Sequence, residues 1–363
     1  MLFLIFRHIY GEIFELGDFK MVDVSEIEVV ATNFKKRLSG VTSTIIQLIP
    51  EQRKLGLKIC VLGSKLPGSI SQIGYFSILK LWKKPKTKLN RIWHARRNNE
   101  MLLGIIFKYL LGMPIKLVFT SAAQREHTKF TKWMIKRMDG VIATSKKSGS
   151  FLEVKHDVVM HGIDINLFKP SIDQKTEGAE GYLIGCFGRV RYSKGTDLFV
   201  EAMIELLPHF PEWTALVCGR VTGPHKSFSN ALRLKVNAAN LTDRIIFKGE
   251  VADIKPFYQD LDLYVAPSRN EGFGLTPLEA MASGTMVIAS DAGSYEEMIL
   301  PGQTGEIVPA GNQELLTKAI EQYFSKPSKA IQGKELCRRH VEDNFQIISE
   351  VNGVSKVYKK LGS

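Results

Sequence analysis

Short apolar runs alternate with longer amphipathic stretches along most of the chain. In the first half, helical periodicity is clearest at 41–56, between two apolar and β-branched runs. Strands that alternate with helices in this way are typical of parallel βαβ units. The strands expected here are 27–34, 57–63, 91–95, 116–121, 140–145 and 157–162. Residues 21–168 therefore predict a Rossmann-like domain of the α/β class.

The same alternation restarts after a polar, glycine-bearing stretch at 169–181, which we interpret as a linker. Residues 182–333 predict a second Rossmann-like domain, and 334–363 predict a helical segment that packs back toward the first domain. The strands expected in the second domain are 182–188, 214–219, 244–249, 261–268 and 285–290, with helices at 196–207, 227–239 and 276–284. Residues 1–20 are a possible N-terminal extension, because Met21 stands just before the first strand.

The composition indicates in which compartment of the cell the protein is expected. The longest strongly apolar stretch, 101–113, contains Lys108 and is too short to span a bilayer. The N-terminus lacks the basic region and the small-residue cleavage site of a signal peptide, so we expect a protein that is not exported. The cysteines follow no metal-ligand spacing and are expected to be reduced and buried: Cys60, Cys186, Cys218 and Cys337.

The positive charge is concentrated in the first half of the chain. Residues 1–170 contain 28 Lys/Arg and 13 Asp/Glu, whereas 171–363 contain 21 and 24. The first half therefore suits an anionic partner, either a membrane surface or a phosphorylated acceptor. A merely solvated basic face is the alternative. Nucleic acid is a third reading, but neither a nucleic-acid motif nor interleaved aromatic residues support it.

Two open sheets joined by a linker suggest a cleft between them, where ligands bind at the carboxyl ends of strands. The loop after the strand at 182–188 carries Arg189, Arg191 and Lys194 just before a helix start, where Thr196 is a suitable N-cap. Cations beside the exposed N–H groups of a helix start favour phosphate. A solvated basic turn is the alternative interpretation.

A second loop, SRNEGFGLTPLEAMASG at 268–284, also follows a strand. Its two glycines allow a ligand to approach the backbone closely. Thr276, Pro277 and Glu279 match the N-cap, N1 and N3 positions of a capping box, so Glu279 has a possible structural role. Glu271 precedes the turn and cannot cap the helix. Carboxylates accept hydrogen bonds from sugar hydroxyls, so a diphosphate flanked by sugars, a nucleotide-sugar, fits both loops.

These residues resemble a known family. The Glu271/Glu279 pair with its internal GFG, the GRVRYSKG of 188–195 and the HGID of 161–164 together resemble the retaining glycosyltransferases of family 4, which have the two-domain GT-B fold. In the first half, segments such as IWHARRNNEM at 92–101 are similar to bacterial lipopolysaccharide core mannosyltransferases. The resemblance runs from about Ile27 to the C-terminus.

The resemblance implies roles on the donor side. Arg189 and Lys194 hold the donor diphosphate and stabilise the leaving group, Glu279 binds the ribose diol, and Glu271 binds the transferred hexose. The other donor-binding positions are Gly188, Gly249, Val251, Gly272, Phe273, Gly274, Leu275 and Thr276. The resemblance further implies retention of the anomeric configuration, no metal, and no cofactor apart from the nucleotide-sugar substrate.

The acceptor side carries a departure from the family. Many members have a histidine at the end of the strand that corresponds to 116–121, and here Thr120 and Ser121 stand there. His94 follows a different strand and is either an acceptor contact or a buried structural residue. The cations that suit an acidic or phosphorylated acceptor are Arg96, Arg97 and Arg125, and Gly40 is expected to approach donor phosphate and acceptor.

The resemblance thus predicts a cytoplasmic glycosyltransferase, peripheral on the inner face of the cytoplasmic membrane. It would move mannose from GDP-mannose to a lipid-linked inner-core acceptor of the Kdo-lipid A type. A nucleotide-sugar epimerase of the same fold and a basic nucleic-acid-binding protein are the alternatives. A nicotinamide oxidoreductase is disfavoured, because no G-x-G-x-x-G follows the first strand of either domain.

Overall fold

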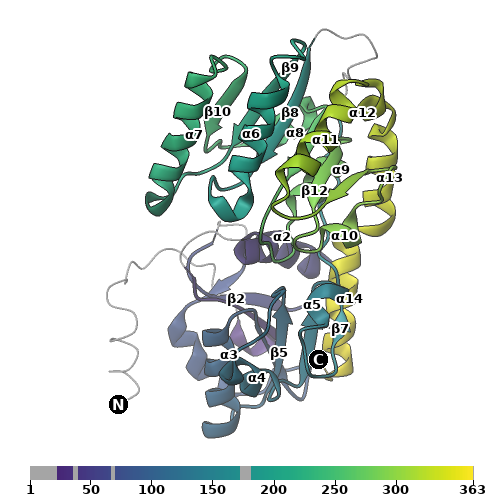
Figure 1. Cartoon of the computed structure of the whole chain (residues 1–363). Helices are drawn as coiled ribbons and strands as arrows, with labels where there is room; N and C mark the ends of the chain where they lie inside the picture. The colour runs from purple at the N-terminus through teal and green to yellow at the C-terminus, as the bar shows by residue number, and fades with distance from the viewer. Residues whose placement is uncertain (1–22, 36–39, 67–69, 172–180, 363) are drawn as a thin grey trace.

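Two parallel sheets organise the chain in the computed structural model, which describes residues 23–35, 40–66, 70–171 and 181–362. Within these ranges the N-terminal sheet has the strand order β3-β2-β1-β4-β5-β6-β7, and the C-terminal sheet has the order β10-β9-β8-β11-β12-β13. Every strand pair is parallel. Figure 1 shows the sheets in two bodies, one above the other. The predicted pair of Rossmann-like domains is confirmed.

The N-terminal sheet is covered on both faces. Its strands are β1 (Val29–Asn33), β2 (Ile59–Gly63), β3 (Gln72–Ile73), β4 (Arg91–Ala95), β5 (Ile115–Ser121), β6 (Gly140–Ala143) and β7 (Asp157–Val158). Its helical elements are η1 (Val24–Glu26), α2 (Gly40–Lys54), η2 (Tyr75–Trp82), α3 (Asn98–Ile105), η3 (Ile106–Leu110), α4 (Lys129–Ile135) and α5 (Lys146–Gly149). Buried residues of η2, α3, η3 and α4 pack on one face, and those of α2 pack on the other. The near-continuous apolar strands follow from this two-sided burial.

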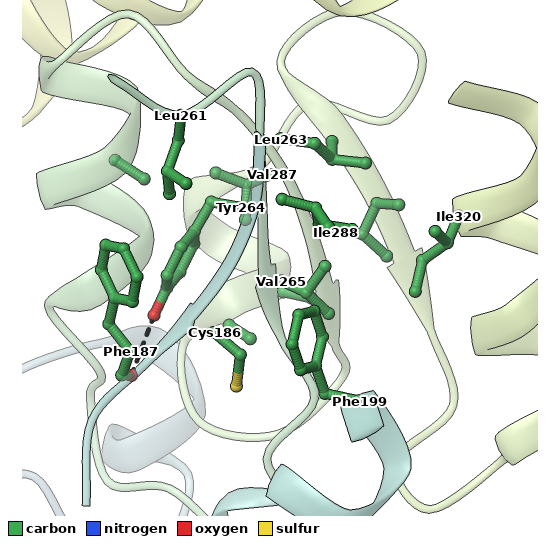
Figure 2. Packing of buried hydrophobic residues seen from close by; sticks show 14 of the residues in the cluster. Cys186, Phe187, Phe199, Leu261, Leu263, Tyr264, Val265, Val287, Ile288 and Ile320 are labelled. Atoms are coloured by element: carbon green, nitrogen blue, oxygen red, sulfur yellow. Dashed lines mark hydrogen bonds between the residues drawn. The ribbon is translucent and has the colours of Figure 1, made fainter. Parts of the chain in front are cut away.

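The C-terminal sheet encloses the larger core. Its strands are β8 (Tyr182–Phe187), β9 (Trp213–Cys218), β10 (Ile245–Gly249), β11 (Leu263–Ala266), β12 (Met286–Ser290) and β13 (Gly305–Val308). Its helical elements are η4 (Tyr192–Lys194), α6 (Thr196–Leu206), η5 (Gly223–His225), α7 (Lys226–Ala238), α8 (Lys255–Asp260), α9 (Thr276–Ala282), α10 (Tyr295–Met298), α11 (Gln313–Phe324) and α12 (Ser328–Gln332). Figure 2 shows Val265, Ile288 and Phe199 packed together beneath these helices.

Two C-terminal helices divide between the domains. α13 (Lys334–Asn344) packs on α9, whereas α14 (Ile347–Lys360) packs on α2 and places Val351, Val354 and Val357 in the core of the N-terminal domain. Figure 1 shows α14, in yellow, running beside the lower body. Between the two helices, the backbone N–H of Ile163 donates to Phe345 and its carbonyl accepts from Ile347. The chain therefore passes between the domains twice at one place.

Two expectations from the composition, on the cysteines and on membrane-spanning helices, can be compared with the structure. All four cysteines are buried and free, as expected for reduced thiols. None of the helices in the described ranges is long and apolar enough to cross a bilayer. The expected N-terminal extension, and most of the expected linker, fall on 1–22 and 172–180, outside the described residues.

Candidate active site

A pocket opens at the carboxyl ends of β8 and β11, which are neighbours in the C-terminal sheet. Its lining includes Gly188, Arg189, Lys194, Thr196, Tyr264, Ser268, Thr276 and Tyr295. The two loops that the sequence singled out both contribute to this lining. Their convergence follows from strand order, because parallel neighbours end at the same edge of a sheet.

The two loops are locked together. The backbone N–H groups of Arg269 and Asn270 both donate to the carbonyl of Ser193, at 3.0 and 3.2 Å. Gly195 has φ +68°, and a Cβ there would lie 1.9 Å from the carbonyl oxygen of Pro267. Only glycine therefore allows the first loop to pass under the second.

Cations gather at the start of α6. Arg189 is exposed, Lys194 is half-buried, and Arg191 lies between them on an extended backbone. The Nε atom of Arg191 is buried without a hydrogen-bond partner among the described residues. Burial and the neighbouring Arg189 lower the pKa of the Arg191 guanidinium. The loop thus holds more positive charge than its own acidic partners neutralise, as an anion site requires.

Lys194, which lines the pocket, contacts Glu271: the Lys194 ammonium donates to Oε2 of the Glu271 carboxylate. Oε1 of Glu271 accepts from the backbone N–H of Gly272 at 3.0 Å. Each carboxylate oxygen has room for a second donor, so two acceptor positions remain. The cationic group and the carboxylate predicted to serve phosphate and sugar are therefore in direct contact.

Glu279 does not cap its helix, and the capping-box interpretation is wrong. α9 begins one residue earlier than the capping pattern requires: Leu275 is the N-cap, it is itself in the αR region, and no side chain caps the helix. Oε2 of Glu279 instead accepts from the hydroxyl of Tyr258 at 2.8 Å. Burial raises the pKa of the Glu279 carboxyl. Among the described residues no donor hydrogen-bonds to its other oxygen, which can therefore accept from a ligand.

Thr196 was also expected as an N-cap, and this is wrong as well. It is the first residue of α6, its side chain is buried, and Gly195 occupies the cap position. The hydroxyl group of Thr196 lines the pocket instead of satisfying the helix start. The N–H groups of the first turn of α6 therefore lack a side-chain cap, which favours an anionic ligand there.

The remaining residues predicted to bind the donor lie around the same edge of the C-terminal sheet. Gly272, Phe273, Gly274, Leu275 and Thr276 form the turn between β11 and α9, with Gly274 at φ +85° and the Phe273 ring buried. Gly249 ends β10 and Val251 follows it, two strands away from β8, and both are half-buried. Their expected contact with the base stays a prediction.

The carboxyl end of β5 faces the Glu271 turn from the other domain. A Cβ at Gly272 would lie 3.1 Å from the carbonyl oxygen of Ala122, and Nε2 of Gln124 donates to Oγ of Ser294 at 3.1 Å. Two predicted acceptor-side residues therefore stand across the cleft: Ser121, which is buried, and Arg125, which is exposed.

The two arginines after β4 differ. Arg97 pairs with the buried Glu100 at 2.7 Å and donates to Oδ1 of Asn33, so it braces the end of β1. Arg96 makes no side-chain hydrogen bond to any described residue, its Nη1 is buried, and burial lowers the pKa of its guanidinium. Of the two, Arg96 is the one available to an anion. Gly40 is the exposed first residue of α2.

His94 is a buried structural residue, which is the second of the two interpretations that the sequence left open. The side chain is fully buried, with Nδ1 2.6 Å from the hydroxyl of Tyr358 on α14 and Nε2 2.7 Å from Oγ1 of Thr120. Burial and Arg96 hold the pKa of the His94 imidazole well below its usual value, so the ring is neutral. His94 ties α14 to the sheet.

Several residues of the site were not predicted from the sequence. Tyr258, from α8, orients Glu279, while Tyr264 and Tyr295 line the pocket and the hydroxyl of Tyr264 donates to the carbonyl of Phe187 (Figure 2). Cys186 also lines the pocket, but burial raises the pKa of its thiol to about 12, so it is no thiolate nucleophile. Only the position of Tyr264 on an expected strand offered a sequence signal.

A contact between the domains was also missed. The backbone N–H groups of Lys146 and Lys147, in the first turn of α5, both donate to the carboxylate of Glu297 at 2.9 Å. The Lys147 ammonium further donates to the carbonyl of Asp291 and pairs with Glu296 at 3.1 Å. These contacts hold α10 of the C-terminal domain against the N-terminal domain beside the cleft.

The two Rossmann-like domains have the architecture of the GT-B class of glycosyltransferases, and the pocket lies in the C-terminal domain. The chain belongs to the family of group 1 glycosyl transferases, whose model matches residues 168–343. It is 56% identical to the lipopolysaccharide core biosynthesis mannosyltransferase LpcC of Rhizobium leguminosarum bv. viciae, over 94% of this chain and 98% of the relative. It is 47% identical to the lipopolysaccharide core biosynthesis mannosyltransferase LpsB of Rhizobium meliloti (strain 1021), over 94% and 99%.

A solved structure supports the fold independently. Anabaena Alr3699/HepE, crystallised in complex with UDP, superposes with a TM-score of 0.78 at 18% identity, covering 92% of this chain and 100% of that one. Among the described residues, no group of three or more His, Cys, Asp or Glu side chains is arranged to hold a metal ion.

Proposed function

We propose that the protein is a retaining mannosyltransferase of lipopolysaccharide core biosynthesis that uses GDP-mannose. Two relatives that match nearly the whole chain, at 56% and 47% identity, carry the name of lipopolysaccharide core biosynthesis mannosyltransferases. The observation that carries the chemistry is the contact between Glu271 and Lys194, a residue that lines the pocket.

That contact supports a proposal for where the bond to be broken would lie. The diphosphate would lie against Arg189, Lys194 and the uncapped start of α6, whose N–H groups attract anions. The hydroxyls of the hexose would occupy the two open acceptor positions of Glu271. Because the two groups touch, the sugar–phosphate junction would fall between them. As the C–O bond breaks, charge grows on the diphosphate oxygen beside Lys194, which stabilises the transition state.

The nucleoside would lie beside Glu279. Glu279 is held by Tyr258, so its free oxygen has a fixed direction in which to accept a ribose hydroxyl. The base would reach the segment after β10, near Gly249 and Val251. The cations and the helix start balance the diphosphate charge, so we propose catalysis without a metal ion.

The acceptor would enter from the N-terminal domain. Of the three arginines predicted on the acceptor side, Arg96 and Arg125 make no side-chain hydrogen bond to described residues, and they suit the carboxylate of an acidic sugar or a phosphate. We propose an inner-core acceptor of the Kdo-lipid A type. The acceptor hydroxyl would attack from the face that the leaving diphosphate occupies, which retains the anomeric configuration without a covalent intermediate.

Purified protein incubated with a panel of radiolabelled nucleotide-sugars and truncated core acceptors tests the proposal. We expect transfer from GDP-mannose, release of nucleotide diphosphate only when acceptor is present, and an α-linked product. A nucleotide diphosphate released without acceptor, together with an epimerised sugar, would instead identify an epimerase.

A further inference from the structure

We propose that one outer surface of the N-terminal domain inserts its aromatic and leucine side chains into an anionic phospholipid bilayer. This surface, the aromatic face, consists of exposed residues on η2, η3 and α4: Tyr75, Phe76, Leu79, Trp82, Tyr109, Leu110, Phe130 and Trp133. The proposal rests on the proposed function in one respect, since it supplies the reason for a membrane: the acceptor is lipid-linked.

The apolar exposure is large for these side chains. Phe76 is 62% exposed, Leu79 69% and Leu110 77%. The same elements bury other apolar residues in the core below, among them Ile78, Phe107 and Met134. The core therefore does not need the outward residues. A contiguous exposed apolar surface on a folded domain marks an interaction site.

The face is continuous across three elements. Nε1 of Trp82 donates to the carbonyl of Leu111 at 2.9 Å, which joins η2 to the end of η3. The hydroxyl of Tyr109 donates to the carbonyl of Arg137 at 3.3 Å, and the guanidinium of Arg137 lies 3.9 Å from the Trp133 ring. Trp133 in turn stacks on Phe130. These contacts link the exposed rings of the three elements to one another.

The charge around the face selects a lipid surface. The ranges 75–82, 106–110 and 129–135 contain no acidic residue. Exposed lysines stand within or next to them: Lys80, Lys83, Lys84, Lys129 and Lys136. Tryptophan, tyrosine and lysine together are typical of residues at the boundary of an anionic bilayer, where aromatic rings lie at the headgroups and lysines contact phosphates. If a second copy of this chain bound the aromatic face through its own aromatic face, the exposed lysines of the two copies would lie close together, and their like charges would repel.

The face also leads to the cleft. At one end, Tyr75 contacts the ring of Phe34, just beyond the carboxyl end of β1. At the other end, Leu81 and Lys83 accept from the Arg91 guanidinium at the start of β4. η2 therefore runs the length of the sheet up to the edge where the acceptor would bind. A protein lying on this face would meet its acceptor at the membrane surface.

Tryptophan fluorescence tests insertion directly. Trp82 and Trp133 belong to the face, whereas Trp93 and Trp213 are buried. On addition of mixed phosphatidylglycerol and phosphatidylcholine vesicles, we expect a blue shift and quenching by brominated lipid, both lost in a W82F/W133F variant. Binding should fall in high salt but persist, because insertion adds to the electrostatic attraction.

A matched pair of variants separates the face from apolar exposure in general. Leu79 and Leu234, the latter on α7, are both 69% exposed. We expect Leu79→Glu to weaken vesicle binding at least about tenfold, and Leu234→Glu to leave it unchanged. Equal binding by both variants, or vesicle binding without a blue shift or quenching, would overturn the proposal. So would a lipid-free dimer that Leu79→Glu dissociates, since the face would then be a subunit interface.

Vesicle binding requires no catalysis, so its failure is distinct from failure of the proposed function. Leu79→Glu should transfer mannose to a deacylated acceptor at the wild-type rate and to acceptor in vesicles more slowly. If neither the wild type nor the variant transfers mannose, the proposed function fails while the vesicle result stands by itself.

Discussion

Replacement of Glu271 tests whether this carboxylate holds the transferred sugar. Lys194 and the N–H of Gly272 each occupy one position on the two carboxylate oxygens, which leaves two positions for hydroxyl groups. Hydrogen bonds to a charged group contribute about 1.5–3 kcal/mol and neutral ones about 0.5–1.5 kcal/mol. Glutamine keeps the shape and loses about 1 kcal/mol per bond, whereas alanine loses both bonds, about 3–6 kcal/mol.

These energies convert into rates. We expect kcat/KM to fall about 5–30-fold in Glu271→Gln and about 10²- to 10⁴-fold in Glu271→Ala, at about 1.4 kcal/mol per tenfold. The assay is the initial rate of labelled mannose transfer to a deacylated acceptor. Because Glu271 contacts Lys194, the double variant with Lys194→Met should lose less than the product of the single losses.

The chain offers a closely matched control. Lys108 and Asp139 form an ion pair whose side chains are 20% and 16% exposed, against 19% and 16% for Lys194 and Glu271. Asp139→Asn should lower the melting temperature without changing kcat/KM. A kcat/KM of Glu271→Ala within about threefold of the wild type, less than a single neutral hydrogen bond, would refute the assigned role. An equal kinetic loss in Asp139→Asn would show that the effect is one of stability.

Three further outcomes are expected. Tyr258→Phe removes the donor that orients Glu279 and should raise KM for the nucleotide-sugar about 3–10-fold with little change in kcat, measured by initial rates. Since burial raises the pKa of Glu279, donor affinity measured by calorimetry should weaken as the pH falls toward that pKa, and Glu279→Gln should remove this acid limb. Because the pKa of His94 is depressed in the fold, protonation favours the unfolded chain, so the melting temperature should drop as the pH falls below about 6.5, less steeply in His94→Gln.

Much of the fold followed from local patterns. The run at 182–188 became β8 because it lacks charged residues and is largely apolar, as a strand covered on two faces requires. The run at 91–95 became β4 although Arg91 and His94 interrupt its apolar residues. β3 and β13 were not predicted. β3 has two residues, and the residues of β13, Gly305–Val308, include a glycine and a glutamate that break the apolar run. Short edge strands depend on their neighbours more than on their own sequence.

Local patterns also predicted one part of the candidate site and not another. Arg189, Lys194 and Glu271 could be predicted because each lies next to its strand in the sequence. The cap of α9 could not, because a shift of one residue turns Glu279 from a helix cap into a ligand-facing group, and local rules do not set that register.

Contacts between residues that lie far apart in the sequence could not be predicted from local patterns. Glu279 meets Tyr258 from another helix, and His94 meets Tyr358, 264 positions further along the chain. The partners of both buried side chains are decided by packing between elements, and no pattern around either residue indicates them.

The most direct test of the account is transfer itself, followed by the linkage of the product. With GDP-mannose and a truncated Kdo-lipid A acceptor, the purified protein should form one mannosylated product whose anomeric proton by NMR is that of an α-mannoside, as retention requires. Transfer from a different nucleotide-sugar in preference to GDP-mannose, or a β-linked product, would contradict the account.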